Sequence, residues 1–373
     1  MIGAFQVGKA AVAVPLLRDD LAISLLTASL VVSAYGLLGA VAGFAFGVAT
    51  SRINARMALV AGLATVGFGS IVGALAPTGA FLIATRIIEG CGFLAIAVAA
   101  PRQIGALAAP RDRETALAFW GVHLPAGTSI MMFAAPFLPL FGWRSLWLAN
   151  GCIALLYALV IARMHLPADQ PRAATAATRA DIARVIRSPG PLLVAIAFGI
   201  YTLHFSALAG LLPALLVERL GVSVAAAGSI SAATVVANAF GNLAAGVLLR
   251  WRTPLWAIIG GAFAVAGVAA LGIFASSAPA LVVAGLAAAS LAVTGLVPAS
   301  IYAAAPLAMP AAGLLGATLG LIVQSSNIGT LFGAALLGGW VEQLGWSTAP
   351  LLFGTIALIE IAIALKLRTL LAK

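Results

Sequence analysis

Two ionisable residues, Arg86 and Glu89, interrupt an apolar run at residues 81–100, FLIATRIIEGCGFLAIAVAA. A run of this length is typical of a membrane-crossing helix, where one arginine or glutamate costs about 2.5–3.5 kcal/mol. Such residues persist when they pair or face a wet cavity, and residues three apart share one helix face. The spacing therefore predicts a buried ion pair facing the bundle interior. This pair either takes part in the protein's function or only orients this helix against the first helix of the chain.

A third buried charge, Lys9, is expected at the same depth. Lys9 lies about nine residues from the outer end of its apolar segment, and Glu89 lies about ten residues from the outer end of its own. At a helical rise of about 1.5 Å per residue, the two groups lie at similar depths. Both groups thus fall near the membrane midplane, where transporter sites are built. Lys9 is predicted to attract an anionic substrate there, and the alternative is that it only neutralises Glu89.

Two histidines fall inside apolar segments. His204 follows Tyr201 by three residues and lies near mid-membrane, whereas His123 lies nearer one end of its segment. In a transporter cavity a histidine donates hydrogen bonds or titrates near neutral pH, whereas a lone histidine is commonly a packed core residue. Tyr201, His204 and His123 are therefore candidate substrate-binding residues, with core packing as the alternative.

Amide side chains mark two further polar stripes. Asn238 precedes Asn242 by one helical turn, and Gln324 precedes Asn327 by three residues. Hydrogen bonding between helices explains such residues as readily as substrate contact, at about 0.6 kcal/mol per bond. Asn238, Gln324 and Asn327 are included among the substrate-binding candidates. Glu360 is an isolated acid in the last apolar segment, to which we assign no role.

The composition identifies the solvent around these residues. Hydrophobic residues make up 63% of the 373 residues and charged residues only 8%, which is the composition of a polytopic membrane protein. Helices are expected throughout, because open strands would leave backbone groups unsatisfied in lipid. The predicted fold class is all-α, with twelve membrane-spanning segments at approximately 1–17, 24–49, 57–77, 79–101, 114–139, 144–165, 190–217, 224–249, 254–275, 279–303, 311–340 and 347–369.

Basic residues sort by loop. When alternate loops are assigned to opposite sides, one side keeps only Arg18, Arg144 and Arg219. The other side carries Arg52, Arg56, Arg102, Arg111, Arg113, Arg163, Arg172, Arg179, Arg184, Arg187, Arg250, Arg252, Lys366, Arg368 and Lys373. By the positive-inside rule both termini are cytoplasmic, in what we expect to be a bacterial inner (plasma) membrane. The net charge of +10 is thus a topology signal, and no nucleic-acid partner is expected.

The longest polar stretch, at 165–190, divides the chain into halves. We expect an N-terminal six-helix bundle at 1–165, a cytoplasmic linker at 166–189 and a C-terminal six-helix bundle at 190–373. The segments 119–143 and 319–346 resemble each other: Gly127 falls opposite Gly329, and each segment closes with Gly-Trp. A duplicated six-helix unit is the signature of a secondary transporter whose site lies between the halves.

Three motifs resemble the major facilitator superfamily. The stretch GVATSRINAR matches that family's first signature at Gly47, Arg52 and Arg56, but Ser51 stands where an acid is expected. RIIEGCG, from Arg86, resembles the fourth-helix signature, and GWRSLWLAN resembles the opening of the sixth helix. The antiporter signature of the fifth helix is not present, which disfavours a drug/proton antiporter.

The resemblance implies a major facilitator-type fold with two six-helix pseudo-repeats. It also implies that Arg86 takes part in proton coupling, with Glu89 as the proton carrier. The loop with Gly47, Arg52 and Arg56 is implied to gate the outward-facing state, and the missing acid weakens that implication. The first segment begins at Met1 without a basic flank, so we expect either a start further upstream or a trimmed helix.

Other function classes fit less well. The histidines are scattered and no aspartate lies inside a predicted span, so no enzyme site or metal site is expected. No phosphate-binding glycine loop is present, so no cofactor and no ATP-driven pumping are expected. Cys91 and Cys152 are interpreted as packing residues. A channel is disfavoured because two homologous halves favour alternating access.

Substrate class is predicted from the buried basic residues. Lys9, Arg86 and two histidines outnumber Glu89, which favours a small organic or inorganic anion imported with protons. The protein is expected to be a monomer. The stretch 7–24 loosely resembles first helices of the cyanate/nitroimidazole permease group. The alternative is proton-coupled efflux of amphipathic drugs or metabolites, if Trp120, Phe133 and Phe205 line a large cavity.

Overall fold

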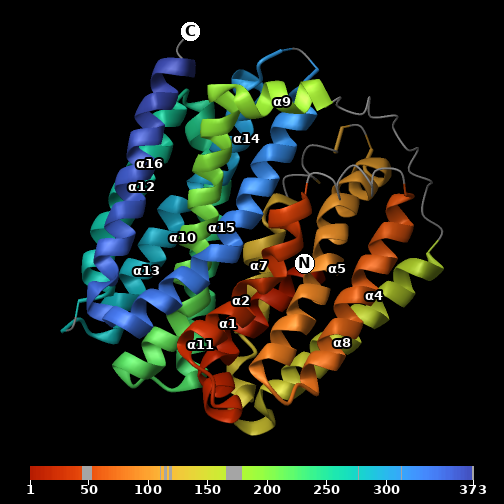
Figure 1. Cartoon of the computed structure of the whole chain (residues 1–373), viewed down its shortest axis with the longest axis vertical. Helices are drawn as coiled ribbons and strands as arrows, with labels where there is room; N and C mark the ends of the chain where they lie inside the picture. The colour runs from red at the N-terminus through yellow and green to blue at the C-terminus, as the bar shows by residue number, and fades with distance from the viewer. Residues whose placement is uncertain are drawn as a thin grey trace.

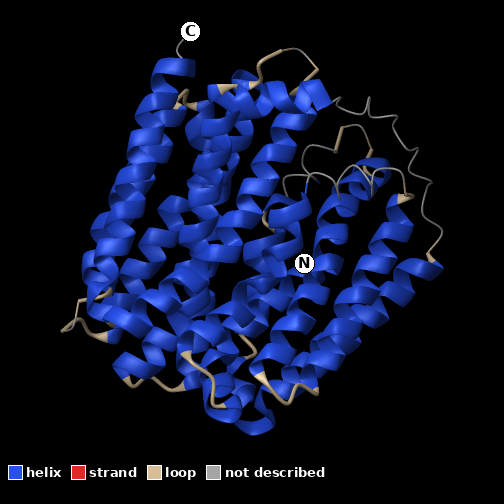
Figure 2. Ribbon diagram, in the orientation of Figure 1, coloured by secondary structure: helices blue, strands red, loops and turns tan. Residues whose placement is uncertain are grey.

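The computed structural model describes residues 1–43, 53–109, 111, 112, 116, 120–164, 179–275, 277–311 and 313–371. Within these residues the chain is helical and contains no strand (Figure 2). The helices, with three short 3-10 turns, are α1 (Ile2–Leu21), α2 (Leu25–Ser33), η1 (Ala34–Gly36), α4 (Ala55–Ala74), α5 (Gly79–Leu107), α7 (His123–Met132), η2 (Ala135–Phe137), α8 (Leu138–Arg163), α9 (Arg179–Arg187), α10 (Pro189–Leu220), α11 (Val224–Arg250), α12 (Leu255–Ile273), α13 (Ala280–Thr294), α14 (Leu296–Ala308), α15 (Leu315–Leu344), η3 (Trp346–Thr348) and α16 (Ala349–Leu371).

Membrane-spanning helices occur where the hydropathy predicts them. Ten stretches of the described chain are long and apolar enough to cross a membrane. One of them, His123–Arg163, contains both α7 and α8, separated by the turn η2. The 20-residue α1, which carries four charged residues, lies beside these stretches. The protein is therefore an all-α integral membrane protein, and each of the twelve expected segments contains a helix.

Two segments deviate from single straight helices. Inside α8, Gly142 has a φ of 73°, which breaks the helix before Trp143. The tenth segment is divided into α13 and α14 at Gly295, which packs directly against the backbone of Asn238 on α11. Hydropathy alone does not reveal such breaks, because the flanking residues are equally apolar.

The helices form two groups. Figure 1 shows the helices before residue 164 on one side and those from Pro189 onward on the other. One end of the bundle, the upper end in Figure 1, holds helix α9, the start of α4 and the ends of α8, α11 and α16; we call it the basic face. The other end, with the α1–α2 and α10–α11 turns, is called the opposite face.

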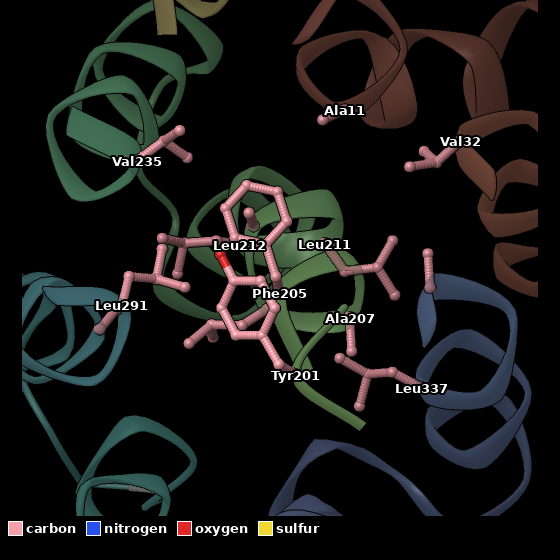
Figure 3. Packing of buried hydrophobic residues seen from close by; sticks show 14 of the residues in the cluster. Ala11, Val32, Tyr201, Phe205, Ala207, Leu211, Leu212, Val235, Leu291 and Leu337 are labelled. Atoms are coloured by element: carbon pink, nitrogen blue, oxygen red, sulfur yellow. The ribbon is translucent and has the colours of Figure 1, made fainter. Parts of the chain in front are cut away.

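The C-terminal half contributes a helix to the centre of the molecule. Tyr201, Phe205, Leu211 and Leu212 of α10 point toward residues of several other helices (Figure 3). Helix α15 packs against α10 so closely that a Cβ at Gly329 would overlap the backbone carbonyl of Gly199. Small residues allow such approach in membranes, where packing rather than water exclusion holds helices together.

Candidate functional site

The buried charges meet in the N-terminal half. Lys9 on α1 donates hydrogen bonds from Nζ to Glu89 Oε1 on α5 at 2.7 Å and to Ser70 Oγ on α4 at 2.6 Å. All three residues are fully buried. The shared depth predicted for Lys9 and Glu89 therefore appears as a direct ion pair that ties three helices together.

Arg86 completes this charge cluster, defined as Lys9, Arg86 and Glu89. Its Nη1 donates to Glu89 Oε2, its Nε donates to the Val31 carbonyl of α2 at 2.9 Å, and its guanidinium lies 5.5 Å from the Tyr35 ring centre. The pair expected from the three-residue spacing is thus present. It also positions α5 against α2.

Two α8 side chains support the cluster. The Trp147 ring centre lies 4.7 Å from Lys9 Nζ, and Ser70 Oγ donates to the Trp147 carbonyl at 2.8 Å. Asn150 Nδ2 donates to Ser70 Oγ at 3.3 Å. Sequence reasoning did not assign Ser70, Trp147 or Asn150 to the site; the signals were the GWRSLWLAN motif, which contains Trp147 and Asn150, and the polar Asn150 within an apolar helix.

The cluster carries excess positive charge. Lys9 and Arg86 carry two formal positive charges and Glu89 one formal negative charge, all at 0% exposure. Within the described chain, Arg86 Nη2, Asn150 Oδ1 and Trp147 Nε1 have no hydrogen-bond partner. Buried polar groups normally have one, so this region keeps unused hydrogen-bonding capacity around a net charge of +1.

A small cavity lies between the two halves. Its volume is about 50 Å³, which is room for a few water-sized groups. It is lined by Val7, Ala11, Val32, Tyr35, Leu124, Thr128, Met132, Tyr201, Thr202, Phe205, Ser206, Ala209, Gly210, Ser326 and Thr330. Among these described residues none carries a formal charge. The polar part of the wall consists of hydroxyl groups, and Tyr35 connects it to Arg86.

Tyr201 is the predicted binding residue that lines this cavity. Its hydroxyl donates to Asn238 Oδ1 at 3.2 Å, and Asn238 Nδ2 donates to the Leu291 carbonyl at 2.8 Å. Asn238 is almost fully buried behind Tyr201. The structure therefore brings these two predicted residues together, with Asn238 holding Tyr201 rather than lining the cavity itself.

The histidines lie outside the cavity wall. His204 Nε2 is 3.1 Å from Ser290 Oγ, and the ring packs edge-on against Phe263 and Phe353 inside the C-terminal half. His123 Nδ1 is 2.6 Å from the Trp120 carbonyl, and the two rings stack at 3.8 Å. The environment of His204 matches the core-packing alternative.

Gln324 and Asn327 lie at a contact between the halves. Gln324 Nε2 donates to the Ala40 carbonyl at 3.2 Å, which joins α15 to the helical stretch after η1. Asn327 donates to the Val323 carbonyl of its own helix and packs directly against Gly39. Both amides thus contact the opposing half instead of the cavity.

Of the predicted gating residues, Gly47 and Arg52 lie outside the described residues. Arg56 donates from Nε to the Ile161 carbonyl at 3.1 Å and from Nη2 to the Ala162 carbonyl, which ties the start of α4 to the end of α8.

The unassigned Glu360 is fully buried, and neither carboxyl oxygen has a hydrogen-bond partner in the described chain.

Polar contacts also join the halves near the opposite face. Arg18 on α1 forms an ion pair with Glu218 on α10. The Glu342 carboxylate on α15 accepts a hydrogen bond from the Leu26 backbone N–H at the start of α2, at 2.8 Å. Any motion that separates the halves at this face must break both contacts.

A family model described as the Major Facilitator Superfamily matches residues 1–312. The chain belongs to the major facilitator superfamily. The inner membrane transport protein YajR of Escherichia coli (strain K12) is 34% identical over 104 residues, which is 28% of this chain and 22% of that relative.

Two solved structures share this superfamily fold. Both are of a bacterial homolog to the human lysosomal transporter Spinster, in inward-facing conformation, and each is 15% identical and covers 100% of this chain. For the unoccupied form the TM-score is 0.77, and the alignment covers 96% of that chain. For the occupied form the TM-score is 0.75, and the alignment covers 92% of that chain.

As a major facilitator superfamily member, the protein is a transporter and not an enzyme. It is a secondary transporter that moves a small-molecule substrate across a membrane by alternating access. The cavity is bounded by α1, α2, η1 and α7 on one side and by α10 and α15 on the other.

Proposed function

We propose that the protein transports a small monovalent anion together with protons. The observation that carries this proposal is the buried cluster of Lys9, Arg86 and Glu89, whose formal net charge is +1. Arg86 lies over the ring of Tyr35, which itself lines the central cavity. An anion in the cavity would offset this charge across a single side chain, in surroundings of low dielectric constant where charges interact strongly.

The cavity fits a small substrate. Its volume of about 50 Å³ is far below the roughly 300–1,000 Å³ of sites for drug-sized ligands. The Thr128 hydroxyl has no hydrogen-bond partner in the described chain and is a donor for a carboxylate or inorganic anion that adds no charge. The Tyr201 and Ser206 hydroxyls, by contrast, become donors for a substrate only when they release Asn238 and the Thr330 carbonyl. In this proposal Tyr201 contacts the substrate, held by Asn238, whereas Lys9 acts through its charge.

Glu89 is the proposed proton acceptor. It receives hydrogen bonds from Lys9 and Arg86, so its protonation would release both cations and raise the cluster charge from +1 to +2. An anion in the cavity makes that state less unfavourable. Anion and proton therefore favour each other's binding, and such coupling is reciprocal, typically about 1–3 kcal/mol. Mutual stabilisation of the doubly loaded carrier is the requirement for symport.

The remaining predicted residues receive roles in the conformational cycle. We assign Gln324 and Asn327 to the contact that must re-form between the halves in each cycle, because both pack against residues after η1. Arg56, with Gly47 and Arg52, is assigned to gating at the basic face. His123 and His204 are assigned to packing around the site. We further propose a monomer in the bacterial inner membrane, with both termini cytoplasmic, from the basic loops.

A second candidate is proton-coupled efflux of an amphipathic compound. It is favoured by the mainly apolar cavity wall, which includes Val7, Val32, Met132 and Phe205. Of the three aromatic residues predicted to line a large cavity, only Phe205 lies in the wall of the described cavity; Trp120 stacks on His123, and Phe133 is 49% exposed. The geometry therefore supports the small anion better.

The test is proton flux in proteoliposomes that contain the purified protein and an internal pH dye. A panel of small anions is added outside, followed by a panel of lipophilic cations. We expect one anion to acidify the lumen, and Glu89→Gln to abolish the response. Glu360→Gln is the matched control, since it is also a fully buried carboxyl in a spanning helix but lies outside the cluster. A response only to lipophilic cations would establish efflux and refute the anion proposal.

A further inference from the structure

Two apolar grooves flank α12 at the outer surface of the C-terminal half. The groove between α12 and α16 has a volume of about 290 Å³ and includes Trp256, Gly260, Ala364 and Leu365. The groove on the other side, against α11 and the α13–α14 break, has a volume of about 340 Å³ and includes Thr253 and Val293. Both grooves include Ala257 and Gly261 of α12.

Gly261 is the reason that the two grooves meet. A Cβ at this position would have no atom within 4 Å, so the missing side chain leaves open space on the exposed side of α12. Nearby, Val265 and Leu365 are each 48% exposed on the groove walls. In a membrane this surface faces lipid chains, and two adjacent grooves match the two acyl chains of one phospholipid.

Basic and aromatic residues gather at one end of these grooves. The Arg368 guanidinium lies 4.8 Å from the ring centre of Trp256, which places the end of α16 against the first turn of α12. The turn before α12 carries Arg250 and Arg252, both exposed, and Trp251, which is 74% exposed. This is the residue pattern that anchors helices at the headgroup level of a bilayer.

The backbone at this end adds further attraction for an anion. Helix α12 begins at Leu255 with Pro254 at its N-cap and no side-chain cap, so its first N–H groups point toward the basic face. Arg252 has a φ of 57°, a left-handed conformation uncommon for residues with a side chain, fixed by the bond from Thr253 N to Leu248 O at 3.0 Å. This tight turn keeps Arg250 and Arg252 together beside the helix start.

We propose that this surface is a specific site for an anionic diacyl phospholipid that straddles α12. The phosphate lies over the first turn of α12 among Arg250, Arg252 and Arg368, and one acyl chain occupies each groove. The charge selects an anionic headgroup over a zwitterionic one, and the grooves select a lipid over a free phosphate. The proposal is independent of the transported substrate, because the site lies outside the cavity between the halves.

The experiment measures thermal unfolding and native mass spectra of the full chain with dioleoyl-phosphatidylglycerol or dioleoyl-phosphatidylcholine. We expect phosphatidylglycerol to be retained preferentially and to raise the unfolding temperature more. Arg250→Gln, Arg252→Gln and Arg368→Gln should each weaken retention about fivefold, the contribution of one basic residue beside an anionic lipid. Gly261→Leu, which the open space at this position accommodates, should displace the lipid by filling both grooves.

Two matched controls separate a site from general surface charge. Arg163→Gln removes an exposed arginine at the basic face of the other half, and Gly354→Leu adds a side chain into open space on α16. Both should leave phosphatidylglycerol retention unchanged. Equal loss in Arg163→Gln, or full retention in both Gly261→Leu and the arginine variants, would overturn the proposal.

Discussion

The charge cluster makes a quantitative prediction about stability. Glu89→Gln leaves Lys9 and Arg86 as two buried cations without a counter-charge, and raises the cluster charge from +1 to +2. Removing one partner of a buried ion pair costs about 3–5 kcal/mol, and here one substitution breaks two pairs. We expect a loss at or above the upper end of this range.

The converse substitution should be milder. Lys9→Met keeps the Arg86–Glu89 pair and brings the cluster to neutrality, so the loss is that of hydrogen bonds to Glu89 and Ser70. Hydrogen bonds to charged groups contribute about 1.5–3 kcal/mol each, and relief of an unneutralised buried charge offsets part of that loss. The double variant restores a net charge of +1, so it should be more stable than Glu89→Gln alone.

The assay is a double-mutant cycle on unfolding in detergent, followed by tryptophan fluorescence, since Trp147 lies beside Lys9. We expect an interaction energy between the two sites of about 2–3 kcal/mol, the upper part of the range for residues in contact. If the losses of unfolding free energy are purely additive, and Lys9→Met is as destabilising as Glu89→Gln, the two side chains do not interact electrostatically. The reasoning from the ion pair would then be wrong.

Three further predictions concern packing, gating and substrate contact. Gly329→Ala should destabilise the protein by about 1–3 kcal/mol, because its Cβ overlaps the facing helix, whereas Gly316→Ala on the same helix meets open space and should be neutral or slightly stabilising in the same unfolding assay. Arg18→Gln removes an exposed ion pair between the halves, which contributes about 0.2–1 kcal/mol, so labelling from the opposite face of a cysteine introduced in the cavity wall by Thr128→Cys should rise by up to about fivefold; unchanged labelling would exclude a gating role. Tyr201→Phe should raise KM for transport, and His204→Gln should leave KM unchanged while lowering stability, because only Tyr201 lines the cavity; the reverse pattern would place the substrate inside the C-terminal half.

The sequence by itself determined the helices. Apolar runs long enough to cross a bilayer specify helices locally, because a backbone in lipid has to satisfy its hydrogen bonds within each segment. The pair at Arg86 and Glu89 was predictable for a related reason, since both residues lie on one helix and their separation is fixed by its geometry. The contact of Lys9 with Glu89 followed as one of two alternatives from depth alone.

Only the tertiary structure decided which polar residues face the cavity. Tyr201 and His204 lie three residues apart on α10, yet one lines the cavity and the other packs between Phe263 and Phe353. A helix contacted on all sides gives both positions the same apolar sequence context, so hydropathy does not distinguish them.

The same limit applies to the site as a whole. Ser70, Asn150 and Trp147 join the cluster from helices distant in sequence, and the cavity hydroxyls come from both halves. Serine and threonine occur throughout spanning helices, where they bond to their own backbone, so their presence carries little information. What turns these residues into a site is the packing of the helices against one another, which depends on side-chain shape across the bundle.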